Sequence, residues 1–230
     1  MPVLVKICGL NTEEALDTAL ETGADMVGFV FFAPSPRHLE AARARALGAR
    51  VRGRALKVAL SVDAADDFLA SSIEALRPDL LQLHGAETPE RVAAIKARFG
   101  LPVMKALAIE HRGDLARLAA YAPVADRILF DARAPREADR PGGLGRTFDW
   151  HVLENLGPDI LDRPLPFMLS GGLHAGNVAE ALRITRAGGV DVSSGVERAP
   201  GEKDPDKIRA FVRAVREADD VSARKVASTA

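Results

Sequence analysis

Residues 3–31, VLVKICGLNTEEALDTALETGADMVGFVF, contain two short, largely apolar runs separated by a longer helical stretch. The runs Val3–Ile7 and Met26–Phe31 have the length and β-branched content of buried strands. Between them, Glu13–Thr22 has the spacing of an amphipathic helix, and Asn11 and Thr12 both offer a side-chain cap at its start. A strand–helix–strand unit of this kind is typical of two parallel strands joined by a crossover helix.

The same alternation continues along the rest of the chain. Further strands are predicted at Leu56–Val62, Leu80–Leu83, Val103–Leu107, Arg127–Asp131, Phe167–Leu169 and Val190–Val192. Further helices are predicted at Leu39–Val51, Ala65–Leu76, Pro89–Phe99, Gly113–Ala120, Trp150–Leu156, Ala175–Thr185 and Pro205–Ala218, with caps at Thr88, Asp149 and Asp204.

Eight strands that each precede a helix, within 230 residues, predict an α/β protein with a single-domain (β/α)8 TIM barrel. An open doubly wound sheet is the alternative. Such a sheet usually has fewer strands, and its dinucleotide-binding form needs a glycine-rich turn after the first strand, where this chain has Cys8-Gly9-Leu10-Asn11. We expect residues 1–220 to form the catalytic barrel and residues 221–230 to form a short polar tail that frays.

Composition excludes several classes of protein. The chain is 47% hydrophobic and 27% charged with a formal net charge of -1, which gives no electrostatic basis for binding nucleic acid. No apolar run is long enough to span a membrane, and the N-terminus MPVLVKICGL does not resemble a signal peptide. The single cysteine, Cys8, rules out an intrachain disulfide and a zinc site built from several cysteines. We therefore expect a cytoplasmic protein with no nucleic-acid or membrane partner.

Glycine and serine follow the last two predicted strands. In a barrel of this class the active site lies at the carboxyl ends of the strands, and the loops after strands seven and eight frequently bind phosphate. The two loops here carry Gly171 and Gly172, and then Ser193, Ser194 and Gly195. Either loop alone could be an ordinary glycine turn, but the pair in these two positions predicts a phosphate site.

Asp131 ends the sixth strand and precedes a long irregular stretch, residues 132–147, which contains several glycines and prolines. Loops of this length inside a compact domain are usually functional, so we expect a lid that excludes water from the carboxyl group. The alternative, an aspartate that caps a helix, is disfavoured because the next helix begins too far along the chain.

Cys8 lies two residues after Lys6 in the first strand, so both side chains point to the same face. A nearby ammonium group would lower the pKa of the thiol and raise the fraction of thiolate. Taken by themselves, the residues leave open whether Cys8 is a reactive group or an inert buried thiol.

Seven motifs, in order and spanning residues 5–197, resemble those of the phosphoribosylanthranilate isomerase family. They are VKICGLNT, GFVFFAPSPRHL, LQLHG, LFDA, GGLGRTFDW, LSGGLHAGNV and GVDVSSGVE. One position departs from the family pattern: Leu144 lies between the glycines of the sixth loop, where members often carry a small hydroxyl residue that could make a hydrogen bond within the lid.

The resemblance implies an Amadori rearrangement of a phosphosugar, with no cofactor and no metal. An acid protonates the furanose ring oxygen, and a base removes the C2′ proton. The family's pattern assigns the acid to Asp131 and the base to Cys8. Arg37 is expected to pair with the anthranilate carboxylate through its planar fork. Gln82, His84 and Asp191 either orient substrate hydroxyls or pack inward as structural residues, and the chain is expected to be a monomer or a homodimer.

Three other functions are weaker alternatives. An indole-glycerol-phosphate synthase would use lysine and glutamate, and a metal-dependent ribulose-phosphate epimerase would need several histidines and carboxylates, whereas His84 is the only histidine at a predicted strand end. A non-catalytic sensor has no need of both Cys8 and Asp131. An isomerase of the related aminoaldose of histidine biosynthesis is expected to have aspartate at the position of Cys8.

Overall fold

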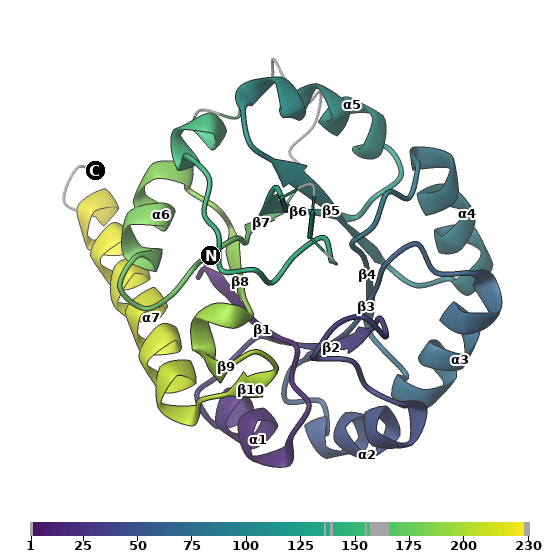
Figure 1. The fold of residues 1–230 in the computed structure, drawn as a ribbon. Coiled ribbons are helices and arrows are strands. Elements are labelled where there is room, and N and C mark those ends of the chain that lie inside the picture. The colour runs from purple at the N-terminus through teal and green to yellow at the C-terminus, as the bar shows by residue number, and fades with distance from the viewer. Residues whose placement is uncertain (1, 136, 139, 155, 157–165, 228–230) are drawn as a thin grey trace.

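The computed structural model describes residues 2–135, 137–138, 140–154, 156 and 166–227. Within them, eight parallel strands follow in sequence order and close into a barrel, because β1 pairs with β8 as well as with β2 (Figure 1). The closed sheet confirms the predicted barrel and excludes the open alternative. The strands are β1 (Leu4–Cys8), β2 (Met26–Phe31), β3 (Leu56–Ser61), β4 (Leu80–Leu83), β5 (Val103–Ile109), β6 (Arg127–Ala132), β7 (Phe167–Leu169) and β8 (Gly189–Val192).

Helices surround the barrel, and α1, α4, α7 and the turn η2 begin where the sequence predicts a cap. At each of these starts the side-chain oxygen of the cap accepts a hydrogen bond of 2.9–3.3 Å from a backbone N–H of the first turn. The accepting residues are Thr12, Thr88, Asp149 and Asp204. The α-helices are α1 (Glu13–Glu21), α2 (Ala41–Val51), α3 (Asp66–Leu76), α4 (Pro89–Phe99), α5 (Leu118–Tyr121), α6 (Val178–Thr185) and α7 (Pro205–Ala227). Short 3-10 turns η1 (Arg112–Arg117), η2 (Trp150–Leu153) and η3 (Ser194–Val196) and the hairpin β9 (Glu197–Ala199) and β10 (Glu202–Lys203) complete the described elements.

Four predicted helices differ from those observed by at least three residues or in type. The seventh, predicted to begin at Ala175, begins at Val178. The fifth begins as η1 because the Asp114 carboxylate accepts the N–H groups of Glu110 and His111 and tightens the first turn. The sixth is only the turn η2, because Glu154 has extended backbone angles that end it; residues 155 and 157–165 lie outside the described part. The last helix, α7, continues from its predicted end to Ala227, and residues 228–230 are not described.

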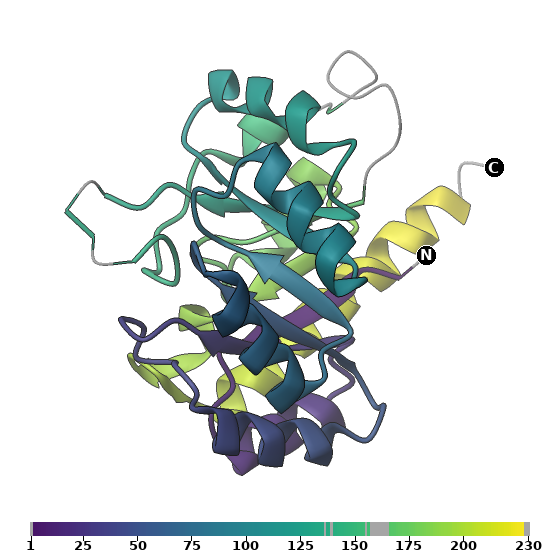
Figure 2. The same cartoon turned by 90° about the vertical axis from the view of Figure 1, so that its right-hand side faces the viewer.

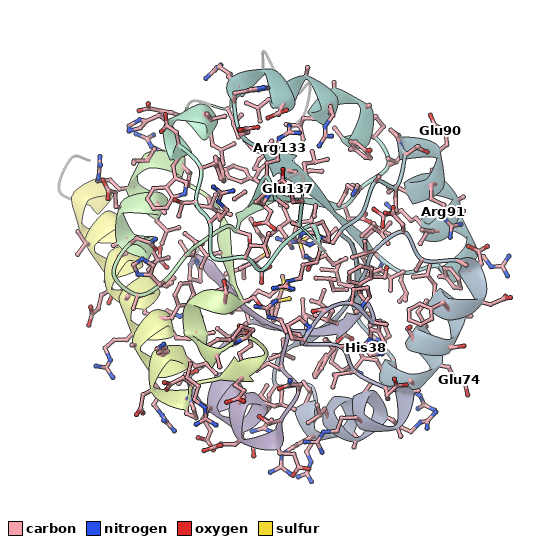
Figure 3. All side chains as sticks on the ribbon, in the orientation of Figure 1. His38, Glu74, Glu90, Arg91, Arg133 and Glu137 are labelled. Carbon is pink, nitrogen blue, oxygen red and sulfur yellow. The ribbon has the colours of Figure 1, made fainter. Side chains whose placement is uncertain are left out.

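Two hydrophobic layers hold the fold together. One lies between the barrel wall and the helices, and the other fills the barrel interior with side chains that include Met26, Val58, Met104 and Met168. Charged side chains of the helices, such as Glu74, point outward (Figure 3). Among the described helices none is long and apolar enough to cross a membrane.

The two ends of the barrel have different roles. Figure 2 shows the long loop after β6 and the β9–β10 hairpin projecting from one end, while both chain termini lie toward the other. The end with the loops is the carboxyl end of the strands, where active sites of such barrels are built.

Aspartates tie neighbouring strands together at the opposite end. Asp25, Asp79 and Asp126 each immediately precede an even-numbered strand. Each accepts a backbone N–H from the preceding odd-numbered strand, at 2.8 Å from Val5, 2.7 Å from Lys57 and 2.9 Å from Val103. These carboxylates satisfy N–H groups at strand starts that the ladder does not pair.

Replacing one of these carboxylates should weaken the fold without touching the opposite end. We expect Asp79→Ala to lower the free energy of unfolding by about 1 kcal/mol, the typical value of one hydrogen bond, and Asp79→Asn to restore most of it because Asn keeps an acceptor oxygen. Urea unfolding measures the difference. An Asp79→Ala protein as stable as the parent would show that this bond contributes nothing.

Candidate active site

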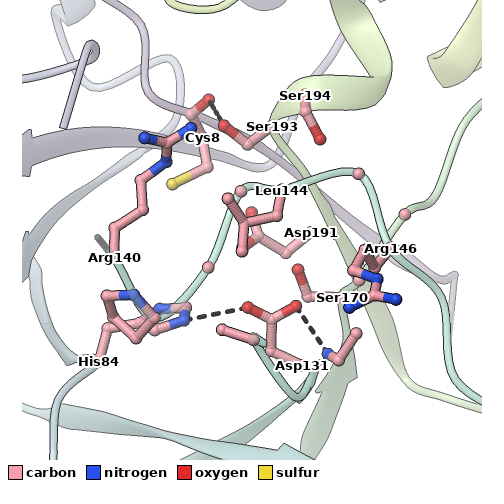
Figure 4. Close-up of a pocket in the computed structure, with 18 of the residues that line it drawn as sticks. Cys8, His84, Asp131, Arg140, Leu144, Arg146, Ser170, Asp191, Ser193 and Ser194 are labelled. Atoms are coloured by element: carbon pink, nitrogen blue, oxygen red, sulfur yellow. Dashed lines mark hydrogen bonds and ion pairs between the residues drawn. The ribbon is translucent and has the colours of Figure 1, made fainter. Parts of the chain in front are cut away.

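One pocket of about 800 Å³, open to solvent, lies at the carboxyl ends of the strands. The loop after β6 forms part of its wall with residues 140–146. Figure 4 shows side chains from both halves of the barrel converging on it. The structure brings together ten of the eleven predicted site residues as lining: Cys8, Arg37, His84, Asp131, Gly171, Gly172, Asp191, Ser193, Ser194 and Gly195.

Cys8 ends β1, lines the pocket and is only 4% exposed. Lys6 shares its face, is fully buried and donates from Nζ to Oδ1 of Asp191 at 2.9 Å. Burial raises the pKa of the Cys8 thiol above its ordinary value, although the Lys6 ammonium works against this rise. Lys6 thus acts on the thiol pKa in the expected direction, but burial outweighs the ammonium.

Gly28 of β2 makes room for this thiol. It is the register partner of Cys8 in the sheet. A Cβ atom at this position would lie 2.8 Å from Cys8 Sγ, closer than real Cβ contacts, and 3.2 Å from Lys6 Cε, which is tight. Gly28 is therefore a functional position that the sequence analysis missed, although a lone glycine inside a strand can signal a close approach.

Asp131 lies across the pocket from Cys8 in Figure 4. Its Oδ2 is 3.0 Å from Nε2 of His84, and its Oδ1 accepts the N–H of Ala132 at 2.9 Å. Behind His84, its Nδ1 is 2.9 Å from Nε2 of Gln82, which is fully buried. The alternatives for these two residues were contact with the substrate or inward structural packing. His84 lines the pocket, whereas Gln82 lies behind it and holds the imidazole ring.

The loop after β6 covers this carboxyl group with a glycine. A Cβ at Gly142 would lie 2.6 Å from Oδ2 of Asp131 and 2.8 Å from Nε2 of His84. The loop is anchored at its base by an ion pair between Arg133 and Asp114. Leu144 lines the pocket, and Figure 4 shows its side chain over the space between Cys8 and Asp131. At this position the chain contributes apolar cover in place of the hydroxyl that family members often carry.

Arg37 follows β2 and is 4% exposed. Its Nε and Nη2 donate to the two carboxylate oxygens of Glu197 at 2.7 and 2.8 Å, and Nη2 also donates to the carbonyl of Gly143 at 3.1 Å. The expectation that the planar fork is available to a ligand needs correction: its Nε–Nη2 edge is occupied by the protein's own carboxylate. The rest of the guanidinium, at Nη1, remains for a ligand.

A buried lysine lies below the loop after β8. Lys203 donates from Nζ to Oε1 of Glu197 at 2.7 Å, and to the carbonyl and hydroxyl oxygens of Ser193 at 2.9 and 3.2 Å. The Ser193 hydroxyl in turn donates to the carbonyl of Cys8 at 3.1 Å. Burial lowers the pKa of Lys203 to about 8. One hydrogen-bond network therefore links the end of β1 at Cys8, the predicted phosphate loop after β8 and Arg37.

The two predicted phosphate loops lie against each other. A Cβ at Gly195 would lie 1.8 Å from the carbonyl oxygen of Leu173, so the backbones of the two loops are in direct contact. Gly171 and Gly172 have positive φ angles of 91° and 59°, which an L side chain rarely adopts. Together these loops form a backbone-rich wall suited to an oxyanion.

Glu197 and Lys203 were also missed as site residues. Glu197, to which no role was given, is the last residue of the motif GVDVSSGVE, and Lys203 lies in a short charged segment, GEKD, that resembles a surface turn. Both are more than 90% buried, which the sequence alone does not indicate. Within the described ranges, no three His, Cys, Asp or Glu side chains are grouped so that they could hold a metal ion.

The fold and this pocket define a (β/α)8-barrel enzyme of the phosphate-binding type. A family model described as N-(5′-phosphoribosyl)anthranilate isomerase matches residues 5–214. A relative of that name from Nitrobacter winogradskyi is 67% identical over 219 residues, 95% of each chain. Another, from a Bradyrhizobium species, is 66% identical over 222 residues, 96% of this chain and 99% of its own.

Solved structures agree with these sequence matches. Phosphoribosylanthranilate isomerase from Thermotoga maritima is 33% identical with a TM-score of 0.81, covering 94% of this chain and 99% of its own. A complex of such an isomerase with reduced 1-(o-carboxyphenylamino)-1-deoxyribulose 5-phosphate is 32% identical with a TM-score of 0.79 and the same coverage. The chain belongs to the N-(5′-phosphoribosyl)anthranilate isomerase family.

Filling the space at Gly28 should displace the thiol. We expect Gly28→Ala to lower kcat by roughly 100-fold, because a shift of about 1 Å in a reacting group has effects of that size. Gly188→Ala is the matched control, since a Cβ there meets its nearest atom only at 3.8 Å. Steady-state kinetics with circular dichroism test this, and a fully active, folded Gly28→Ala protein would contradict the role given to Gly28.

The lowered pKa of Lys203 also makes stability depend on pH. The unfolded lysine has an ordinary pKa of 10.5 and the folded one about 8, so between these values the unfolded state binds more protons and stability rises with pH. We expect wild type to gain up to about 3 kcal/mol relative to Lys203→Met between pH 7 and pH 10. Urea unfolding of both proteins across this range measures the difference, and a constant difference would refute the shift.

Proposed function

We propose that the chain catalyses the Amadori rearrangement of N-(5′-phosphoribosyl)anthranilate to 1-(2-carboxyphenylamino)-1-deoxyribulose 5-phosphate in tryptophan biosynthesis. The observation that carries the proposal is one pocket that combines a thiol on β1, a carboxyl group on β6 and glycine- and serine-rich loops after β7 and β8. The family membership supports the same aldose–ketose isomerisation.

Asp131 is the proposed general acid. In its protonated form it gives its proton to the furanose ring oxygen. The C1′–O bond breaks, the nitrogen lone pair forms a C1′=N bond, and the ring opens to a protonated imine. His84 holds Oδ2 at 3.0 Å and the Ala132 N–H holds Oδ1, so the carboxyl group has a fixed orientation toward the pocket. The loop backbone at Gly142 keeps bulk water from this group.

Cys8 is the proposed general base. Its thiolate removes the C2′ proton, and the electron pair forms the C1′–C2′ double bond while the C1′=N π electrons return to the positively charged nitrogen. The product is a neutral enolamine, which tautomerises to the ketone. Lys6 favours the thiolate, whereas burial disfavours it. The thiol is thus a strong but sparsely ionised base, which matches abstraction of a weakly acidic carbon-bound proton.

The substrate lies across the pocket in one orientation. Its phosphate binds the loops that carry Gly171, Gly172, Ser193, Ser194 and Gly195, and its anthranilate carboxylate meets Arg37. Asp191 lines the interior and is held by Lys6 at 2.9 Å, where it can also orient a sugar hydroxyl. Gln82 contributes through His84. The reaction as proposed uses neither cofactor nor metal.

The remaining proposals concern the whole chain. Residues 1–220 act as one catalytic domain, the protein is cytoplasmic, and it works as a monomer or a homodimer without nucleic-acid or membrane partners. One related solved structure is of monomers generated from the dimeric phosphoribosylanthranilate isomerase of Thermotoga maritima, so sedimentation is the direct way to decide between the two states.

The assignment of the two proton-transfer groups can be tested by loss of anthranilate fluorescence during turnover of freshly made phosphoribosylanthranilate. We expect rapid conversion by the parent and at least a roughly 1,000-fold lower kcat for Cys8→Ala and for Asp131→Asn, because each removes one proton-transfer group. Both variants should still bind the reduced product analogue.

Each outcome has a distinct meaning. An inert parent that binds the phosphorylated analogue would support a non-catalytic sensor and refute the proposed function. An active parent with one fully active variant would retain the reaction but refute the role of that residue. Turnover of the histidine-pathway aminoaldose at a comparable kcat/KM would refute selectivity for anthranilate.

A further inference from the structure

We infer that Glu197 is a positioning residue for recognition of the substrate carboxylate, acting through Arg37. This inference rests on the proposed function and adds to it how the pocket distinguishes a substrate that carries a carboxylate from one that does not. It arises from the buried network of Arg37, Glu197 and Lys203 beside the pocket.

The contact geometry fixes which edge of the guanidinium a ligand can meet. Glu197 binds the Nε–Nη2 edge of Arg37 with both oxygens, at 2.7 and 2.8 Å, and the two side chains are 5% and 4% exposed. A planar guanidinium held along one edge cannot rotate about its own axis. Arg37 therefore presents Nη1 in a single direction, beside the loop backbone at Gly143, where it lines the pocket.

The Gly143 carbonyl occupies part of the guanidinium edge that a ligand carboxylate would use. Nη2 has a second hydrogen, which is donated to the Gly143 carbonyl at 3.1 Å. A carboxylate that bridges Nη1 and Nη2 replaces this carbonyl with a charged acceptor, and charge-assisted bonds are the stronger ones. The substrate thus competes with the loop for one hydrogen while Glu197 keeps its own two bonds.

Lys203 makes this arrangement electrostatically possible. A lone Glu197 would cancel the charge of Arg37 and repel an incoming carboxylate. Lys203 shares the Glu197 carboxylate at 2.7 Å, so the three groups sum to one positive charge while all are paired. The pKa of Glu197 is lowered by its bonds to Arg37 and Lys203, which outweigh its burial, so it stays ionised.

The decisive measurement compares two ligands. One is reduced 1-(o-carboxyphenylamino)-1-deoxyribulose 5-phosphate, and the other is the same molecule without the carboxyl group. Calorimetry gives the ratio of their Kd values, and we expect about 10- to 100-fold tighter binding of the carboxylate in wild type, as for a charge-assisted bond. In Glu197→Gln, whose amide N–H₂ faces a guanidinium donor, the ratio should fall by about 10-fold.

Four further variants separate positioning from folding. Arg37→Ala should bring the ratio of the two Kd values to about 1. Adding Glu197→Gln to Arg37→Ala should not change that ratio further, because the glutamate acts through the arginine. Glu87→Gln is the matched control: it breaks the buried Lys105–Glu87 pair, 2.9 Å apart, which lies outside this network, and it should keep the wild-type ratio. If Glu197→Gln does not fold, Glu197→Asp serves as the test. It keeps the charge on a shorter side chain, and we expect its ratio of Kd values to lie below that of wild type.

The outcomes separate this inference from the proposed function. A wild-type protein that binds neither ligand overturns the proposed function and this inference with it. A wild type that prefers the carboxylate, beside folded Glu197→Gln and Glu197→Asp proteins with the same preference, overturns the inference alone. In kinetics the inference requires KM for the substrate to rise in Glu197→Gln while kcat changes little, since ground state and transition state carry the same carboxylate.

Discussion

Closure of the sheet is the constraint on which the rest of this molecule depends. A parallel sheet of eight strands leaves no exposed edge only if its first strand also pairs with its last, and here Lys6 of β1 is in register with Asp191 of β8. That pairing brings the thiol at residue 8 beside the loop at residues 193–195. It also places a lysine and an aspartate in the barrel interior, where neither could be buried alone.

In the loop after β6, glycine allows close packing, whereas the sequence indicates flexibility. A glycine-rich segment predicts flexibility, but Gly142 lets the loop backbone come within contact of Asp131 and His84. The loop is also attached at two points. Arg133 at its base pairs with Asp114, and the carbonyl of Gly143 accepts a hydrogen bond from Arg37. Cover over the Asp131 carboxyl group is thus obtained by close packing of backbone. In the proposed mode of substrate binding, the bond from Arg37 to the Gly143 carbonyl is exchanged for one to the ligand.

Sequence reasoning predicted the strands well and the helices less well. Buried parallel strands are continuous apolar runs, so all eight were located to within two residues at either end. Helix ends depend on local hydrogen bonds such as those of Asp114, which a periodicity cannot show. The strand-end residues were predictable because a barrel directs every strand to one rim. Gly28, Glu197 and Lys203 were not, since their roles come from contacts between segments far apart in the chain, and the sign of the Cys8 pKa shift depends on burial.

The aspartates at the far end of the barrel divide it into modules. Each of the first three strand–helix–strand–helix quarters carries its own side-chain tie, from Asp25, Asp79 or Asp126. The last quarter has Gly188 before its even strand, and its carbonyl accepts the N–H of Leu4 from the first quarter. Three quarters are therefore internally fastened and could serve as interchangeable building blocks for recombination. The fourth is the seam of the ring, where the first and last strands meet through the Leu4–Gly188 backbone bond and the Lys6–Asp191 pair. There Asp219 and Arg216 of α7 also bond the backbone of Val3.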